Sequence, residues 1–250
     1  MRLIRPRGTA LCLLMLAGAS FVSMGCSRIP GRPGPGPEVA RPSEVLDFSK
    51  LYRANCAACH GENGRNGAAI SLANPTYLAV VGEENLRGIT ANGVAGKLMP
   101  PFVKSAGGML TDQQVAVLAH GIMQRWSGPN LFAGQKLPPY RAEQTGDGER
   151  GQEAFGSFCA RCHGLAGEGS SGDGKGSMGK SGSIVDGAYL ALISDQGLRS
   201  IVIAGRPEEG MPDWRSDGAQ PLTDQQITDI VAWLGSKRTA SPGQPYPAQQ

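Results

Sequence analysis

Two copies of one five-residue pattern hold most of the reactive side chains in this chain. The first copy occupies residues 56–60 (Cys-Ala-Ala-Cys-His) and the second residues 159–163 (Cys-Ala-Arg-Cys-His). Paired thiols with an adjacent histidine at this spacing form the attachment signature of a c-type haem. The thiols add across the haem vinyl groups as thioethers, and the histidine is held under the iron as its proximal ligand. The pattern therefore predicts two covalently bound haem c groups, attached through Cys56, Cys59, Cys159 and Cys162 and ligated by His60 and His163.

A zinc site and a redox disulfide are the competing uses of such cysteines. Zinc ribbons also contain Cys-x-x-Cys pairs, but their pairs lie about 15–20 residues apart. Here 103 positions separate the two patterns, and each pair has its own adjacent histidine. A Cys-x-x-Cys oxidoreductase would need a β-strand before the motif, whereas a helical pattern precedes both copies. Two matches in the same context favour haem over both alternatives.

The two motifs belong to a longer internal repeat. From Tyr77 onward the second copy lies at a constant offset of 112 positions, so that Leu110-Thr-Asp-Gln-Gln matches Leu222-Thr-Asp-Gln-Gln. At the motifs themselves the offset is 103 positions. The second copy therefore carries nine additional residues between His163 and Tyr189, inside a run rich in Gly and Ser. This register pairs each residue of one copy with its counterpart in the other.

The register also selects one candidate for the opposite iron ligand in each copy. Met99 and Met211 differ by 112 positions, and each of them precedes a proline. A thioether opposite histidine favours ferrous iron and raises the reduction potential. Met109 and Met123 fail the same test, because other residue types occupy their partner positions. We therefore predict Met99 and Met211 as the distal ligands.

Two further features give weaker evidence of function. His120 is the one remaining histidine, and its partner in the repeat is Ala232. We expect a partly buried or surface side chain there, with a role as a second distal ligand left open. Residues 174–181 match the P-loop pattern, but a P-loop must leave a buried strand and enter a helix whose N-terminus holds phosphate. Neither element is expected around this segment, so no nucleotide binding is predicted.

The N-terminus has the pattern of an export signal. Three arginines precede residues 10–22, an apolar stretch of 13 residues, which is too short to span a bilayer. Residues 23–27 (Ser-Met-Gly-Cys-Ser) resemble a bacterial lipobox, which implies that Cys26 is diacylated and becomes the mature N-terminus. Ordinary cleavage after Ala19 is the alternative. A lipid on Cys26 would tether the exported protein to the periplasmic side of a bacterial membrane without spanning it.

Signal removal would also change the charge balance. The full chain has 24 Lys and Arg against 21 Asp and Glu, a formal net charge of +3. The excess equals the three signal arginines, so a chain beginning at Cys26 carries equal numbers of both signs. The basic balance is therefore no evidence for a nucleic-acid partner, and none is expected.

Composition and periodicity divide the chain into six segments. They are a signal peptide (1–25), a Pro/Gly-rich tether (26–43), a first domain (44–126), a linker (127–147), a second domain (148–238) and a disordered tail (239–250). In the first domain we expect helices over about 44–54, from Pro75 and over about 83–92, with an extended Met-Pro loop after them. Thr111 and Gln114 predict a capping box at the start of the last helix.

This order of parts resembles a class I c-type cytochrome, twice in tandem. The family has an N-terminal helix that leads into Cys-x-x-Cys-His, then short helices, a Met-Pro loop and a closing helix. The resemblance covers about residues 44–126 and 148–238. Diheme members such as cytochrome c4, and the cytochrome subunits of oxidases and dehydrogenases, share this arrangement. It implies an all-α fold of two tandem domains, each a few short helices around one covalent haem.

The resemblance implies an electron carrier and not an enzyme. Two irons with histidine and methionine ligands have no open position for a substrate. We expect the chain to carry electrons between membrane-associated redox complexes, across two domains joined by a flexible linker. A quinol-oxidising complex, a terminal oxidase or a dehydrogenase would be its partner. The alternatives are a diheme enzyme, such as a peroxidase or a sulfur-compound dehydrogenase, and a fixed cytochrome subunit of an oxidase or dehydrogenase complex.

Overall fold

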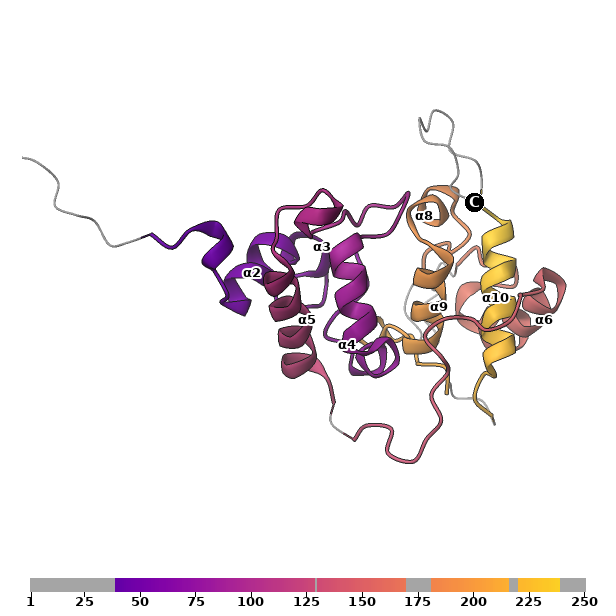
Figure 1. The fold of residues 1–250 in the computed structure, drawn as a ribbon. Coiled ribbons are helices and arrows are strands. Elements are labelled where there is room, and N and C mark those ends of the chain that lie inside the picture. Colours follow the sequence, from indigo (N-terminus) through magenta and orange to yellow (C-terminus); the bar gives the residue numbers. More distant parts are fainter. Residues whose placement is uncertain (1–38, 129, 170–180, 216–219, 239–250) are drawn as a thin grey trace, which may run out of the picture. The chain divides into compact units, whose positions relative to one another are not determined.

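The repeat appears in the computed structural model as two similar groups of helices (Figure 1). The structure describes residues 39–128, 130–169, 181–215 and 220–238. The predicted signal peptide, Cys26, most of the tether, the C-terminal tail and most of the P-loop-like segment lie outside these residues. Within the described residues there are helices and two isolated backbone bridges, with no β-strand. The all-α prediction is therefore confirmed.

The first group contains four α-helices and two short 3-10 helices. Its α-helices are α2 (Phe48–Asn55), α3 (Ala57–His60), α4 (Pro75–Asn92) and α5 (Asp112–Trp126), and its 3-10 helices are η1 (Pro42–Glu44) and η2 (Lys104–Ala106). The second group repeats this order. It consists of α6 (Gly148–Phe158), α7 (Ala160–His163), α8 (Gly187–Leu192), α9 (Asp195–Ala204), η3 (Pro207–Glu209) and α10 (Asp224–Ser236).

The last helix of each group begins where the sequence predicts. The Thr111 hydroxyl accepts a hydrogen bond from the Gln114 backbone N–H, and the Gln114 side chain accepts one from the Thr111 backbone. Thr223 and Gln226 form the same capping box at α10. Each box satisfies two N–H groups that would otherwise have no partner at the helix start. The repeated Thr-Asp-Gln-Gln motif therefore fixes the start of both terminal helices.

The middle helices of the two groups differ at one glycine. The sequence predicts two short helices in the first half, and the structure joins them into α4 with a sharp bend at Gly82. Gly82 has φ +65°, a left-handed backbone conformation that interrupts the helical geometry. In the second half, α8 and α9 are separate helices, and Ser194 caps the start of α9 through the Gly197 N–H. Gly82 therefore marks the break that the sequence pattern anticipates.

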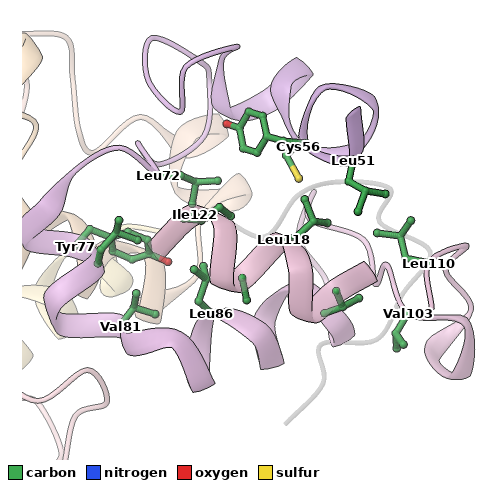
Figure 2. Close-up of a cluster of buried hydrophobic side chains, with 14 of the residues drawn as sticks. Leu51, Cys56, Leu72, Tyr77, Val81, Leu86, Val103, Leu110, Leu118 and Ile122 are labelled. Carbon is green, nitrogen blue, oxygen red and sulfur yellow. The ribbon is translucent and has the colours of Figure 1, made fainter. Parts of the chain in front are cut away.

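Each group buries its own cluster of apolar side chains. The first cluster includes Leu78 and Leu118, which are fully buried, and also contains Cys56 of the first motif (Figure 2). The second cluster is centred on Phe155, Leu190 and Ile227. Such small clusters supply little burial by themselves. A covalently attached porphyrin would add a large apolar surface to each of them.

The terminal helices of each group cross closely at a glycine. In the first group the glycine is on the C-terminal helix, where a Cβ at Gly121 would lie 2.2 Å from the Phe48 ring. In the second group the glycine is on the N-terminal helix, where a Cβ at Gly151 would lie 2.9 Å from Cβ of Trp233. By the register, Phe48 matches Gly151 and Gly121 matches Trp233. The two halves therefore make the same close crossing with the large and small residues exchanged.

The linker packs against the helices, which differs from the flexible connection expected from its composition. Phe132 is buried, and its ring centroid lies 5.4 Å from that of Trp214. The Tyr140 side chain packs against the first cluster, while its backbone carbonyl accepts a hydrogen bond from the Gln196 amide at 2.7 Å. The described part of the linker is therefore an ordered strap that contacts both halves.

The buried side chain of Arg199 holds this strap against the second half. This side chain is 3% exposed, pairs with Asp224 and donates to the backbone carbonyls of Pro139, at 2.8 Å, and Tyr140, at 3.2 Å. A buried guanidinium needs most of its donors satisfied, because it cannot lose its charge. Arg87, its counterpart in the first half, is exposed. The second half therefore uses this buried arginine to bind the linker backbone.

Candidate haem sites

Each predicted attachment motif forms a single helical turn. In the first, the N–H groups of Cys59 and His60 donate to the carbonyl of Cys56 at 3.2 and 3.0 Å. In the second, Cys162 and His163 donate to the carbonyl of Cys159 at 3.1 and 3.0 Å. Residues three and four apart on a helix share one face. The structure therefore brings the two thiols and the imidazole of each motif together on one turn.

A glycine ends each of these turns in a conformation that other residues rarely adopt. Gly61 and Gly164 both have φ +79°. A Cβ at Gly61 would lie 1.9 Å from the Arg65 carbonyl oxygen, and one at Gly164 would lie 2.4 Å from the Glu168 side chain. Only glycine tolerates both the positive φ and the close approach. The glycine after each histidine is therefore required by the turn that presents the histidine.

The four predicted attachment cysteines are thiols, with no disulfide between them. Burial raises the pKa of Cys56 to about 12, with a further contribution from Cys59. Burial and the neighbouring Cys162 raise the pKa of Cys159 to about 11. Two thiols on one turn beside an imidazole form the donor set that covalent haem requires. The residues present therefore fit a haem c at each motif.

The predicted proximal histidine of the first half is oriented by a backbone carbonyl. Nδ1 of His60 lies 2.8 Å from the oxygen of Ile70. A carbonyl only accepts hydrogen bonds, so Nδ1 carries the proton and the lone pair of Nε2 remains for a metal. Burial lowers the pKa of His60, although the hydrogen bond to Ile70 opposes this shift. The neutral imidazole favoured here is the form that binds iron.

The second proximal histidine has a different environment. Nδ1 of His163 is buried and has no hydrogen-bond partner among the described residues. Burial lowers the pKa of His163 as well. Ile70 lies in the part of the repeat where the second half carries its additional residues, so the register assigns it no counterpart. The two halves therefore share the motif but differ in the hydrogen bonding of the proximal imidazole.

The predicted distal methionines lie on matching loops after α4 and α9. Gly93 and Gly205 end these helices with φ +67° and +65°. The Met99 carbonyl accepts a hydrogen bond from the Val94 N–H at 2.9 Å, and the Met211 carbonyl accepts one from Arg206 at 3.0 Å. Both methionine side chains are partly exposed. The structure thus places both residues in equivalent, backbone-bonded loops separate from the Cys-His turns.

The next hydrogen bonds of the two loops also match. The Phe102 N–H donates to the Ala91 carbonyl at 3.0 Å, and the Trp214 N–H donates to the Ile203 carbonyl at 2.9 Å. Both pairs differ by 112 positions. The loop after each Met-Pro pair is therefore tied back to the preceding helix in the same way, which extends the repeat from sequence to backbone geometry.

The His120 side chain is exposed and lies beside Glu83. Its Nδ1 is 3.4 Å from Oε1 of Glu83, and the two side chains are 66% and 50% exposed. This agrees with the expectation of a surface side chain.

Among the described residues, no group of three or more His, Cys, Asp and Glu side chains gathers as a metal site. No helix in the described segments is long and apolar enough to cross a bilayer.

One family model matches the chain in both halves. It is described as cytochrome c oxidase, cbb3-type, subunit III, and it covers residues 44–120 and 146–234. The chain belongs to this family. The two matched regions coincide with the two repeats, so the protein is a diheme c-type cytochrome of the cbb3-type family with two cytochrome c domains.

The chain is also similar to two other proteins. The cbb3-type cytochrome c oxidase subunit FixP of Sinorhizobium medicae (strain WSM419) is 26% identical over 199 residues, which cover 75% of this chain and 59% of that protein. This chain thus spans less than two thirds of the length of that relative. A chain of the reducing HAO-like protein complex of Kuenenia stuttgartiensis has a TM-score of 0.45 and 18% identity, over 80% of this chain and all of that one.

Sequence reasoning missed two buried polar residues, Asn74 and Arg199. Both make buried hydrogen bonds that depend on the docking of one half against the other or against the linker. The register offered one signal for Asn74, because its counterpart is Asp186 and an amide differs from a carboxylate in having donors. Arg199 had no such signal, since its counterpart Arg87 is also an arginine.

Proposed function

We propose that this chain transfers single electrons through two haems, each held between a histidine and a methionine. The observation that carries the proposal is the duplicated site: the same Cys-His turn and the same Met-Pro loop occur in both halves, with matching backbone hydrogen bonds. Cys56, Cys59, Cys159 and Cys162 would hold the haems, and His60, His163, Met99 and Met211 would ligate the irons. When bound, each haem supplies a one-electron ferrous–ferric couple.

The chain's own residues would set the properties of these couples. The Ile70 carbonyl orients His60 and makes the imidazole a stronger donor. The apolar side chains packed around Cys56 and Cys159 would form the low-dielectric surroundings of the haems. A thioether at Met99 and Met211 would favour the ferrous state. With both axial positions taken, no substrate would reach the iron, which is why an electron carrier is favoured over a diheme peroxidase or dehydrogenase.

The partner we propose is a membrane-bound oxidase. The FixP relative is named as a subunit of a cbb3-type cytochrome c oxidase, and the chain would serve a comparable complex either as a fixed cytochrome subunit or as a carrier that docks to it. The oxidase would then bind its substrate on another chain of the complex. Copurification of the native complex from membranes distinguishes the fixed subunit, which stays with the oxidase, from a carrier that separates from it.

Single methionine variants test the ligand assignment. Met99→Ala and Met211→Ala should each lower the potential of one haem and open that iron to carbon monoxide, because a vacant axial position replaces the thioether. Met109→Ala is the matched control, since Met109 is 82% exposed and fails the repeat register. Mass spectrometry should also find two covalent haems per chain. Unchanged potentials in both ligand variants, or a chain without haem, would contradict the proposal.

The membrane attachment is proposed at Cys26, which lies outside the described residues. Acylation there would tether the exported cytochrome to the periplasmic face of the membrane. Cys26→Ser should therefore release the protein into the soluble periplasmic fraction, whereas Cys12→Ser, which alters a cysteine inside the signal, should not. Membrane retention of Cys26→Ser at the wild-type level would rule out this anchor.

A further inference from the structure

Asn74 makes hydrogen bonds within the first half and across to the second. Its side-chain oxygen caps α4 by accepting from the Thr76 and Tyr77 N–H groups at 2.9 and 3.2 Å. Its side-chain amide donates to the carbonyls of Ala204 and Gly205, at 3.1 and 3.2 Å. Asn74 is 4% exposed. A single buried side chain therefore joins the start of α4 to the end of α9.

On the first side, Asn74 is close in sequence to the segment that orients the proximal ligand. His60 is hydrogen-bonded to the carbonyl of Ile70, four residues before Asn74. The intervening Leu72 and Ala73 are buried, and the Ala73 N–H donates to the Gly64 carbonyl at 2.9 Å. The position of the Asn74 side chain is therefore fixed relative to the proximal turn of the first haem site.

On the second side, the acceptors of Asn74 adjoin the distal-ligand loop. A Cβ at Gly205 would lie 2.6 Å from the carbonyl oxygen of Met211, so the two backbones are in direct contact. The next residue, Arg206, forms a pair of hydrogen bonds with the backbone of Met211, at 3.0 and 3.1 Å. Asn74 therefore connects the proximal side of the first site with the distal side of the second.

The repeat register shows what helix capping alone requires at this position. The counterpart of Asn74 is Asp186, which caps α8 by accepting from the Tyr189 N–H at 2.9 Å and is exposed. Asn and Asp are about equally good as helix caps. A carboxylate, however, has no proton to donate to a carbonyl. The cap explains an oxygen at position 74, and the contact with α9 explains why that residue carries an amide.

Other contacts between the two halves support the same interface. Helix α4 packs against α9 (Figure 1). Ala204 of the second half belongs to the first apolar cluster, and the Lys97 ammonium donates to the Ala191 carbonyl at 2.7 Å. Tyr140 of the linker packs on the first cluster while Arg199 of the second half holds its carbonyl. Asn74 lies within this surface and supplies its buried hydrogen bonds.

We infer that Asn74 is the positioning residue that fixes the two cytochrome domains for electron exchange with each other. This inference rests on the proposed function. In the exchange step, a ferrous iron in one domain loses one electron and a ferric iron in the other gains it, and no bond forms or breaks. The amide of Asn74 holds the proximal segment of one site against the distal loop of the other. Without it, the docked arrangement is less populated and exchange slows.

The test uses the full-length, haem-loaded protein with one electron per chain. Asn74→Asp keeps the cap but places a carboxylate against two carbonyl oxygens, and Asn74→Ser keeps a cap without the amide. Flash photolysis should show interdomain exchange slowed by roughly tenfold in both variants, the factor that corresponds to about 1.4 kcal/mol of lost docking. Asp186→Asn is the matched control and should exchange at the wild-type rate.

Two further readouts keep the outcomes separate. Both haems of each variant should titrate at wild-type potentials, because no ligand is altered, and peptides of α4 and α9 should exchange amide hydrogens faster. Wild-type exchange rates in both Asn74 variants, or an equal loss in Asp186→Asn, would overturn the inference. Loss of reversible redox chemistry in the wild-type protein would instead overturn the proposed function.

Discussion

Replacing Gly151 by alanine should separate the two helices that close the second domain. Gly151 lies in α6 where that helix crosses α10, and a Cβ there would be 2.0 Å from the carbonyl oxygen of Asp229 and 2.5 Å from its carbon. Unstrained carbon contacts are about 3.5–4.0 Å, so the helices would have to move apart by more than about 1 Å. The obstructing atoms are backbone, and no side-chain rotation can relieve the contact.

The magnitude follows from two opposing effects. Overpacking of this kind costs about 1–3 kcal/mol, and the contact with backbone places Gly151→Ala near the upper end. Alanine recovers about 1 kcal/mol through its higher helix propensity. The net prediction is a loss of about 2 kcal/mol in the stability of the second domain. Gly156, in the same helix, is exposed with nothing within 4 Å of its Cβ position, so Gly156→Ala should gain about 1 kcal/mol.

Amide hydrogen exchange of the full-length holoprotein resolves these effects by region. A loss of about 2 kcal/mol corresponds to exchange roughly 30-fold faster, and it should appear in peptides of α6 and α10. Peptides of α2 and α5 serve as the internal reference, because they belong to the other domain. If Gly151→Ala protects α6 and α10 as well as Gly156→Ala does, the close crossing described above is not what stabilises the domain.

Two further predictions concern the proximal histidines and a buried carboxylate. In NMR spectra of the reduced protein, the ring N–H of His60 should exchange more slowly with solvent than that of His163, and the first haem should titrate at the lower potential, because the Ile70 carbonyl makes His60 the stronger donor. Equal protection of both protons would contradict this. Asp229→Asn should destabilise the second domain by about 2 kcal/mol at neutral pH. Burial alone would raise the pKa of Asp229, but hydrogen bonds, led by that from Arg150, lower it overall. The wild-type carboxylate therefore contributes stability above its unfolded pKa of about 3.9 and loses that contribution as pH falls through the folded value. Denaturation midpoints of wild type and variant should converge in acid, and a constant difference would contradict the assignment.

Features that depend on neighbouring residues in the chain could be predicted from the sequence. Thr111 and Gln114 form the expected capping box because both partners lie within one helical turn. The turn that holds Cys56 and His60 follows from the motif and from the glycine after it. The two prolines after Met99 predict an extended loop there, and the expected boundary between two short helices before residue 83 corresponds to the bend at Gly82. In all these places the local sequence restricts the backbone to few conformations.

Contacts between distant segments could not be predicted in the same way. The linker composition of proline, glycine and polar residues is the same whether the segment packs or remains free. Its attachment depends on Arg199, about 60 residues later in the chain, whose burial no periodicity indicates. The donors of Asn74 likewise matter only once α9 lies opposite. These interactions are set by tertiary docking, which overrides local preference.

The exchange of residues at the helix crossing shows how two halves of one repeat can diverge while each remains packed. A Cβ at Gly121 would meet the Phe48 ring, whereas a Cβ at Gly151 would meet the Asp229 backbone and the Cβ of Trp233. A residue larger than glycine at either position would therefore occupy space that the facing helix already fills. Such overpacking is costly in a packed interior. The pairs must therefore change together, and each domain is specific for its own N-terminal and C-terminal helices.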